Sequence, residues 1–235
     1  LNRSKPGGKY KPIRIREVSV KNSRFGLAIE GSKTDTIGID FTNMQLNQLN
    51  IQAQNLIIFR DTVNVDIEEL NFREQSGFRV ESLTGHYELC NAFMAFTDTR
   101  IVTGHSNLDI ASAKLTYDEY ADFKPDSLYD QVTMNLNLKQ SMLNAYDLGF
   151  FTDFFHQTHQ TLNLAGIFNG PVSNLKGRQF LLGWGSTSFL AGSFNINGLP
   201  NPDNTFLIFD LSEMVTSMRD LENLDIPGDL RLDLP

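Results

Sequence analysis

Few residues of this 235-residue chain could do chemistry, and its four histidines are the first to consider. Asp153, His156 and His159 follow one another at three-residue spacing, which on a helix brings three potential metal ligands to one face. A metal site usually needs a further strong ligand and supporting hydrogen bonds, whereas threonine, glutamine and phenylalanine surround these three residues. We therefore expect surface residues at a helix end, and we expect neither a metal nor a cofactor.

The serine, glycine and carboxylate motifs do not match a known catalytic pattern either. Gly183–Ser186 lacks the lysine and the strand–loop–helix setting of a phosphate-binding loop. Thr103–Ser106 places a serine after glycine and histidine, but it is not the G-x-S-x-G sequence of a serine hydrolase. Glu68 and Glu69 lie in an alternating segment and suit a solvated face, and the sole cysteine, Cys90, has apolar neighbours. The sequence therefore predicts a protein that is not an enzyme.

Charge is distributed unevenly along the chain. Residues 1–24 carry eight lysines and arginines against Glu17, a net of +7, so the remainder holds −15. An acidic body argues against nucleic-acid binding, because phosphate contacts need a basic surface. The basic segment 1–24 has two possible roles. It contacts an anionic membrane face or a partner, or it serves as a solubilising terminal arm. No segment approaches the roughly 18 apolar residues of a membrane span, and the start at Leu1 indicates a mature product or an excised piece.

Alternating apolar residues dominate the chain from Ile13 onward and predict strand after strand. The stretch 162–200 shows this most clearly, because glycines interrupt its short alternating segments every few residues. A change of phase between Leu46 and Leu49 predicts an irregularity within one strand. A hairpin is expected around Gly31–Asp35. The fold class predicted is therefore mostly β: an elongated, curved antiparallel sheet.

Three segments depart from the two-residue rhythm. Asp118–Tyr129 is charged and contains a proline, which indicates a loop. Paired phenylalanines predict a short helix near Asp147–His156. Apolar residues at three- and four-residue spacing in 211–221 predict an amphipathic helix with Ser212 as its cap.

The phenylalanines, 18 against one tryptophan, leave two architectures open. In the first, the apolar face of the sheet packs on a second sheet or a helix and the aromatic residues fill the space between them. In the second, the sheet curls into an open trough whose apolar face is left for a lipid, and the glycines help it to bend. Periodicity alone does not separate these alternatives.

Several segments, taken in their order along the chain, resemble the translocation and assembly module subunit TamB and related AsmA-superfamily proteins of Bacteroidota-type bacteria. These are the entry to a strand at Ser76–Phe78, the turn at Thr103–Ser106, the glycine-rich step at Gly166–Leu175 and the hairpin at Thr187–Gly198 that leads into Gly-Leu-Pro. The likeness covers most of residues 13–224.

The resemblance implies a repeating β-groove, the so-called β-taco, in the periplasm of a Gram-negative cell envelope. Members of the family are anchored in the inner membrane and extend toward an outer-membrane Omp85-type barrel such as TamA. They are implicated in moving phospholipid between the membranes and in outer-membrane protein assembly. Because this chain lacks the anchor helix and the C-terminal domain, we expect an internal fragment with a flexible lead-in at 1–12 and a groove domain at 13–235.

The predicted function is therefore non-catalytic: shielding phospholipid acyl chains between the inner and outer membranes. The residues predicted to line the groove are Val63, Val65, Ile67, Met134, Leu136, Leu138, Leu162, Leu164, Phe194, Ile196, Phe206 and Ile208. The alternative is a closed β-sandwich of the envelope that binds a protein or glycan partner.

Overall fold

The computed structural model describes residues 11–28, 38–119, 122, 125–152, 155–199, 201 and 204–225. The hairpin expected around Gly31–Asp35, and all but two residues of the lead-in at 1–12, lie outside this part of the chain.

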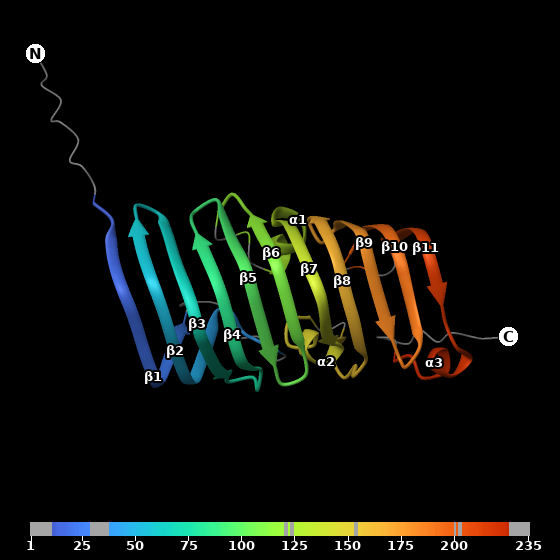
Figure 1. Cartoon of the computed structure of the whole chain (residues 1–235), viewed down its shortest axis with the longest axis horizontal. Helices are drawn as coiled ribbons and strands as arrows, with labels where there is room; N and C mark the ends of the chain where they lie inside the picture. The colour runs from blue at the N-terminus through green and yellow to red at the C-terminus, as the bar shows by residue number, and fades with distance from the viewer. Residues whose placement is uncertain are drawn as a thin grey trace, which may run out of the picture.

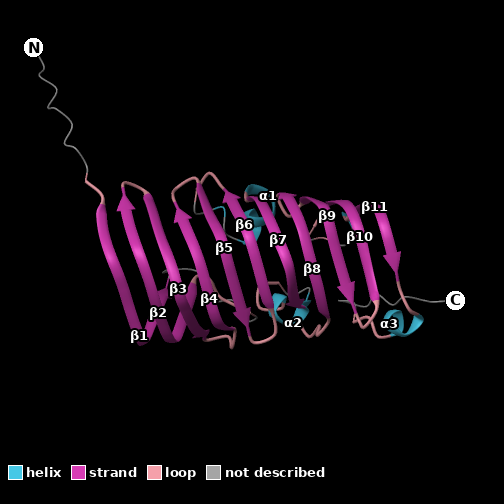
Figure 2. Ribbon diagram, viewed as in Figure 1, coloured by secondary structure: helices cyan, strands magenta, loops and turns pink. Residues whose placement is uncertain are grey.

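Eleven strands form one antiparallel sheet in which each strand pairs with its neighbours in the sequence (Figures 1 and 2). The strands are β1 (Ile13–Ala28), β2 (Asn43–Phe59), β3 (Thr62–Glu74), β4 (Arg79–Leu89), β5 (Phe93–Thr103), β6 (Asn107–Thr116), β7 (Thr133–Asn144), β8 (Thr161–Gly170), β9 (Asn174–Trp184), β10 (Ser188–Asn197) and β11 (Phe206–Val215). The predicted elongated, open and mostly antiparallel sheet is confirmed. All the described strands belong to this one sheet, so the second sheet of a sandwich is not found among them.

The sheet has an apolar face and a polar face, which we call the inner and outer faces. Directly paired residues of antiparallel strands point to the same side, so the register assigns each residue to a face. On the inner face Ile110, Ala113 and Leu138 are buried and pack against neighbours that include Phe168. A row of residues paired in succession defines the outer face from β3 to β11: Asn64, Glu88, Ala95, Lys114, Asn135, Asn169, Lys176, Asn195 and Ile208.

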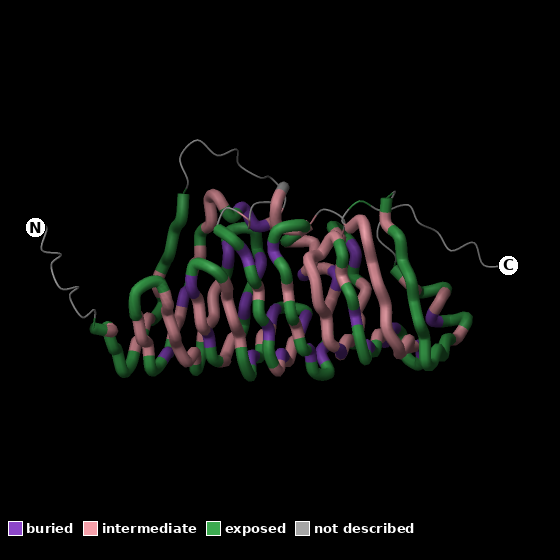
Figure 3. The backbone as a smooth tube through the Cα atoms, turned by 90° about the horizontal axis from the view of Figure 1, so that it is seen from above, coloured by how far each residue is buried: buried purple, intermediate pink, exposed green. Residues whose placement is uncertain are grey.

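Irregularities in the strands explain why the sheet curves. Register shifts interrupt nine of the ten strand pairings, the exception being β5 with β6. Several shifts lie beside residues with positive φ, such as Gln48 (53°), Gly85 (143°) and Gly166 (146°). A bulge bends its strand and increases the local twist. Shifts in neighbouring strands therefore bend the whole sheet. Figure 3 shows the protein turned by 90° from the view of Figure 1. In this second view the strands extend perpendicular to the plane of Figure 1, because each strand is bent along its length.

The helices are short and differ from the predicted ones. The expected loop contains α1 (Pro125–Gln131), and the expected helix near Asp147–His156 is only α2 (Ala145–Leu148). The predicted helix at 211–221 is wrong in its first half, because residues up to Val215 pair with β10. Ser212 accordingly donates a hydrogen bond to the carbonyl of Ala191 and caps nothing. The helix α3 (Met218–Glu222) starts later and is capped by Ser217. None of the helices in the described residues is long and apolar enough to cross a bilayer.

Two connections distant in sequence meet over the inner face and form what we call the bridge: residues 38–42, before β2, and residues 145–152, after β7. The backbone N–H of Ile39 donates to the carbonyl oxygen of Phe150 at 2.8 Å. Ile39 also packs with Phe78 and Val80 of the sheet, and Phe150 lies against this cluster. The rings of Phe78 and Phe150 lie 5.4 Å apart. The bridge therefore covers part of the inner face between β3 and β7.

Candidate functional site

The largest contiguous feature on the inner face is a row of apolar and glycine residues. It crosses from β3 to β11 through residues paired in succession: Val65, Tyr87, Phe96, Ala113, Leu136, Phe168, Gly177, Phe194 and Phe209. A second row runs parallel to it from β1 to β7: Ile13, Ile58, Val63, Leu89, Met94, Leu115 and Met134. Leu175, Ile196 and Leu207 continue the second row on β9, β10 and β11. Neither row contains a charged side chain, so the inner face presents an apolar strip along the whole sheet.

Ten of the twelve residues predicted to line a groove lie on this face. Six of them are members of the two rows: Val63, Val65, Met134, Leu136, Phe194 and Ile196. Leu138 and Leu164 pack in the buried cluster around Ile110. Ile67 alternates with Val65 along β3, and Leu162 alternates with Leu164 along β8. The structure thus brings these ten side chains to one surface, spread over four strands.

The assignment of Phe206 and Ile208 to the same surface is wrong. Ile208 pairs with Asn195 and Phe206 pairs with Asn197, which places both on the outer face. Leu207 and Phe209 lie on the inner face instead. The segment 206–209 is apolar at every position, so alternation could not choose a face and only the register with β10 could.

Several inner-face residues were not among the predicted ones, and some of them are aromatic. Phe96, Phe168 and Phe180 belong to this group, as does Tyr87, whose ring lies edge-on to Phe96 at 5.3 Å. Burial raises the pKa of the Tyr87 phenol above its usual value, because the ionised form loses solvation. A signal was available for three of these residues, since Tyr87, Phe96 and Phe180 each alternate with an apolar neighbour two positions away along the strand.

Glycines on the inner face make room for aromatic rings from adjacent strands. A side chain on Gly177 would overlap the ring of Phe194, which is paired with it on β10. Phe180 of β9 contacts both Phe194 (5.1 Å between centroids) and Phe209 (6.3 Å), although Phe209 lies two strands away. Phe180 and Phe209 therefore meet beside the ring of Phe194, which contacts both of them.

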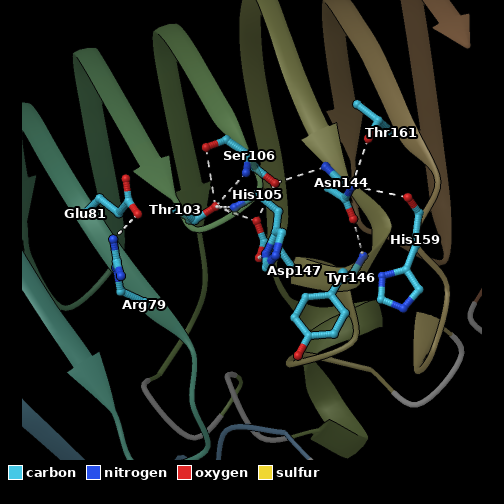
Figure 4. A network of polar contacts seen from close by, with 10 residues as sticks. All are labelled: Arg79, Glu81, Thr103, His105, Ser106, Asn144, Tyr146, Asp147, His159 and Thr161. Carbon is cyan, nitrogen blue, oxygen red and sulfur yellow. Dashed lines mark hydrogen bonds and ion pairs between the residues drawn. The ribbon is translucent and has the colours of Figure 1, made fainter.

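A buried carboxylate joins α2 to the turn between β5 and β6 (Figure 4). Asp147 is 5% exposed and accepts hydrogen bonds from the hydroxyls of Thr103 and Ser106, the latter at 2.5 Å. His105 Nδ1 lies 3.3 Å from the other carboxylate oxygen. The backbone N–H of Asn144 donates to Ser106 Oγ at 3.0 Å. Because Ser106 is buried and its hydroxyl is engaged by Asp147, the serine fastens the bridge to the sheet and is not placed as a nucleophile.

A second buried carboxylate holds α3 against the turn between β9 and β10. Asp220 accepts from the backbone N–H groups of Ser186 (3.2 Å) and Thr187 (3.0 Å), and from the hydroxyl of Ser188 at 2.8 Å. These hydrogen bonds, that of the Ser186 backbone foremost, hold the pKa of Asp220 well below its usual range. Asp220 therefore remains ionised and keeps the turn in place.

The histidines do not form a metal site in the described part of the chain. No group of three or more histidine, cysteine or acidic side chains is placed there to hold an ion, and Asp153 lies outside the described residues. His159 stacks on Tyr146 at 5.2 Å, and His105 lies edge-on to the same ring. On the outer face His86 pairs with Asp66; hydrogen bonds from Asn55 and then His86 lower the pKa of this carboxyl.

Comparison of the chain with protein-family models, with curated proteins and with solved structures found no match.

Proposed function

We propose that the inner face shields phospholipid acyl chains, as a non-catalytic segment of a lipid path between the inner and outer membranes. The observation that carries this proposal is the uncharged row of side chains that crosses the sheet from Val65 to Phe209. Phe209, at the end of this row, is 47% exposed, whereas Tyr87 and Ala113 are buried and the other side chains of the row are half-buried. A continuous row of apolar side chains that stays partly accessible is typical of a binding surface.

The energetics of an acyl chain suit such a surface. Removing one methylene from water gains about 0.8 kcal/mol, so ten methylenes on the strip gain roughly 8 kcal/mol as an upper bound. This gain requires no specific polar contact. A path along which an acyl chain moves also needs similar affinity for that chain at successive positions. Dispersed leucine, valine, methionine and phenylalanine side chains meet both requirements.

The cellular setting of the proposal rests on the resemblance to TamB-like proteins. It comprises a periplasmic location, a longer protein anchored in the inner membrane, and contact with an outer-membrane Omp85-type barrel through parts absent from this chain. A supporting role in outer-membrane protein assembly belongs to the same proposal.

A charge placed on the inner face tests the acyl-binding role. We expect Leu136→Asp and Phe194→Asp each to reduce the phospholipid that co-purifies with the protein, measured by mass spectrometry. The matched controls are Asn135→Asp and Asn195→Asp, which add the same charge to the outer face one residue away. The only tryptophan, Trp184, is buried beside Leu162, so its fluorescence provides a second readout when decanol is added.

Each variant must first show the circular-dichroism spectrum of the original sheet. Equal lipid content in inner-face and outer-face variants would contradict the proposal. If the original protein carries no lipid and Trp184 fluorescence does not respond to decanol, the inner face does not bind acyl chains.

A further inference from the structure

The bridge contains a cavity of about 460 Å³ that the acyl-chain proposal does not use. It lies between the turn after β3, the start of the segment before β2 and the connection after β7. Its lining includes Ser76, Tyr146, Phe150, His156, Gln157 and His159. These residues come from connections far apart in the sequence, so the bridge itself creates the cavity.

Polar groups converge on this cavity without partners of their own. The side chains of Ser76, Tyr146, His156, Gln157 and His159 make no hydrogen bond with any other described residue. Each of them can donate a hydrogen bond, through a hydroxyl, an imidazole N–H or an amide. Ser76, His156, Gln157 and His159 are exposed and Tyr146 is half-buried, so water satisfies these groups in the free protein. A ligand with several acceptor oxygens would replace that water.

The charged groups near the cavity are already engaged elsewhere. No lysine, arginine, aspartate or glutamate is among the described residues that line it. Asp225 accepts the backbone N–H of His159 at 2.8 Å, and Asp147 is bound by the hydroxyls of Thr103 and Ser106. The described residues that line the cavity thus offer hydroxyls, an amide and two imidazoles, all of which can donate to an oxyanion.

Phe150 connects the cavity to the apolar inner face. Its side chain packs against the cluster of Ile39, Phe78 and Val80, and the same residue lines the cavity. Because Ile39, Phe78 and Val80 are each no more than 8% exposed, this cluster leaves no room for a ligand. The tail of an amphiphile whose head lies at the donors would therefore lie beyond this cluster on the inner face. Apolar surface next to convergent polar groups is the usual composition of a small-molecule site.

We propose that this cavity binds the phosphate group of a lipid whose acyl chain lies on the inner face. The inference rests on the proposed acyl-binding function and adds a fixed position for the headgroup. Phosphate oxygens accept hydrogen bonds from the imidazoles of His156 and His159, from the hydroxyls of Ser76 and Tyr146 and from the amide of Gln157.

Three probes separate the contributions of head and tail: decyl phosphate, decanol and inorganic phosphate. Calorimetric titration of the whole chain should give an affinity for decyl phosphate at least tenfold higher than for decanol. The double variant His156→Ala/His159→Ala should bring the two affinities together while leaving decanol binding unchanged. Ser76→Ala, in a different connection, should reduce the difference by a smaller factor. His86→Ala is the control, because this histidine lies on the outer face beside Asp66.

The outcomes distinguish this inference from the proposed function. If decanol binds but decyl phosphate binds no more tightly, or if the double variant keeps the tenfold preference, only the headgroup site is wrong. If inorganic phosphate binds as tightly as decyl phosphate, the cavity is a site for free phosphate and its link to the lipid is wrong. If neither decyl compound binds, the acyl-binding function fails and this inference fails with it.

Discussion

The bridge covers the inner face between β3 and β7 but does not extend over β8 to β11, which we call the uncovered half. Where the bridge meets the sheet, Ile39 of the bridge and Phe78 and Val80 beneath it are each no more than 8% exposed. At the other end of the sheet, Leu207 and Met214 of β11 are 50% and 56% exposed. The two halves nevertheless continue the same rows of paired residues.

The difference in burial between the two halves separates the role of strand pairing from the role of the bridge. Backbone pairing and alternation build the sheet equally well with and without a cover, so the sheet does not require the bridge in order to form. The bridge instead determines how much apolar surface the protein buries with its own residues. Within the uncovered half Phe180 and Trp184 of β9 are still buried, so β11 is the part of the inner face most available to another molecule.

The largest change in the free energy of unfolding is expected for a substitution beneath the bridge. Comparing it with a substitution in the uncovered half tests whether burial differs between the two halves. Phe78→Ala should lower the free energy of unfolding by about 3–5 kcal/mol, because it empties a buried site beneath the bridge. Phe209→Ala, at a half-exposed site in the uncovered half, should cost no more than about 1 kcal/mol. Urea denaturation of both variants measures the two values. Equal costs would mean that the bridge does not bury the face beneath it.

A smaller effect concerns the packing of rings over glycine in the uncovered half. Gly177→Ala should destabilise the protein by about 1–3 kcal/mol, because the added methyl group displaces the Phe194 ring. Gly26 of β1 is the control, since a methyl group there meets nothing within 4 Å. Thermal unfolding followed by circular dichroism compares them. A Gly177→Ala variant as stable as Gly26→Ala would show that the ring moves aside without cost.

The smallest expected effect is a pH-dependent loss of amide protection in the turn between β9 and β10, in the uncovered half. The pKa of Asp220 is lowered in the folded state, so its contribution to stability is present above the unfolded value of about 3.9 and is lost as the pH falls below it. Hydrogen-exchange protection of the Ser186 and Thr187 amides should fall correspondingly at low pH. Asp220→Asn should remove this protection at neutral pH and leave the Ile39 amide, bonded to Phe150, unchanged. Protection that persists in Asp220→Asn would contradict the role of the carboxylate.

Local sequence patterns were sufficient to predict most of the sheet. The change of phase between Leu46 and Leu49 marks a real irregularity, where Gln48 has a φ of 53° and the pairing with β3 shifts between Asn47 and Asn50. Alternation also assigned residues such as Leu136 to one face correctly, because polar neighbours separated the apolar positions.

The errors arose where the outcome depends on contacts between distant residues. Spacing in 211–218 suits a helix and a strand alike, and pairing with β10 decided in favour of the strand. Residues 36–41 were expected to form the second strand of the hairpin around Gly31–Asp35, but their described part, from Gly38 onward, lies outside the sheet. There Ile39 contacts the backbone and the side chain of Phe150. The lining of the cavity in the bridge depends on the same long-range meeting.

The strictly sequential order of the strands has a consequence for how the molecule folds. Each new strand finds its partner in the strand made just before it, so the sheet can lengthen from one end while the chain is still emerging. The contact between Ile39 and Phe150 cannot form until β7 has been added, and we expect it to close late. Pulse-labelled hydrogen exchange would detect this order as delayed protection of the Ile39 amide. Until then the apolar surface beneath the bridge is as exposed as that of β11, so the growing chain is most vulnerable to aggregation before the seventh strand is in place.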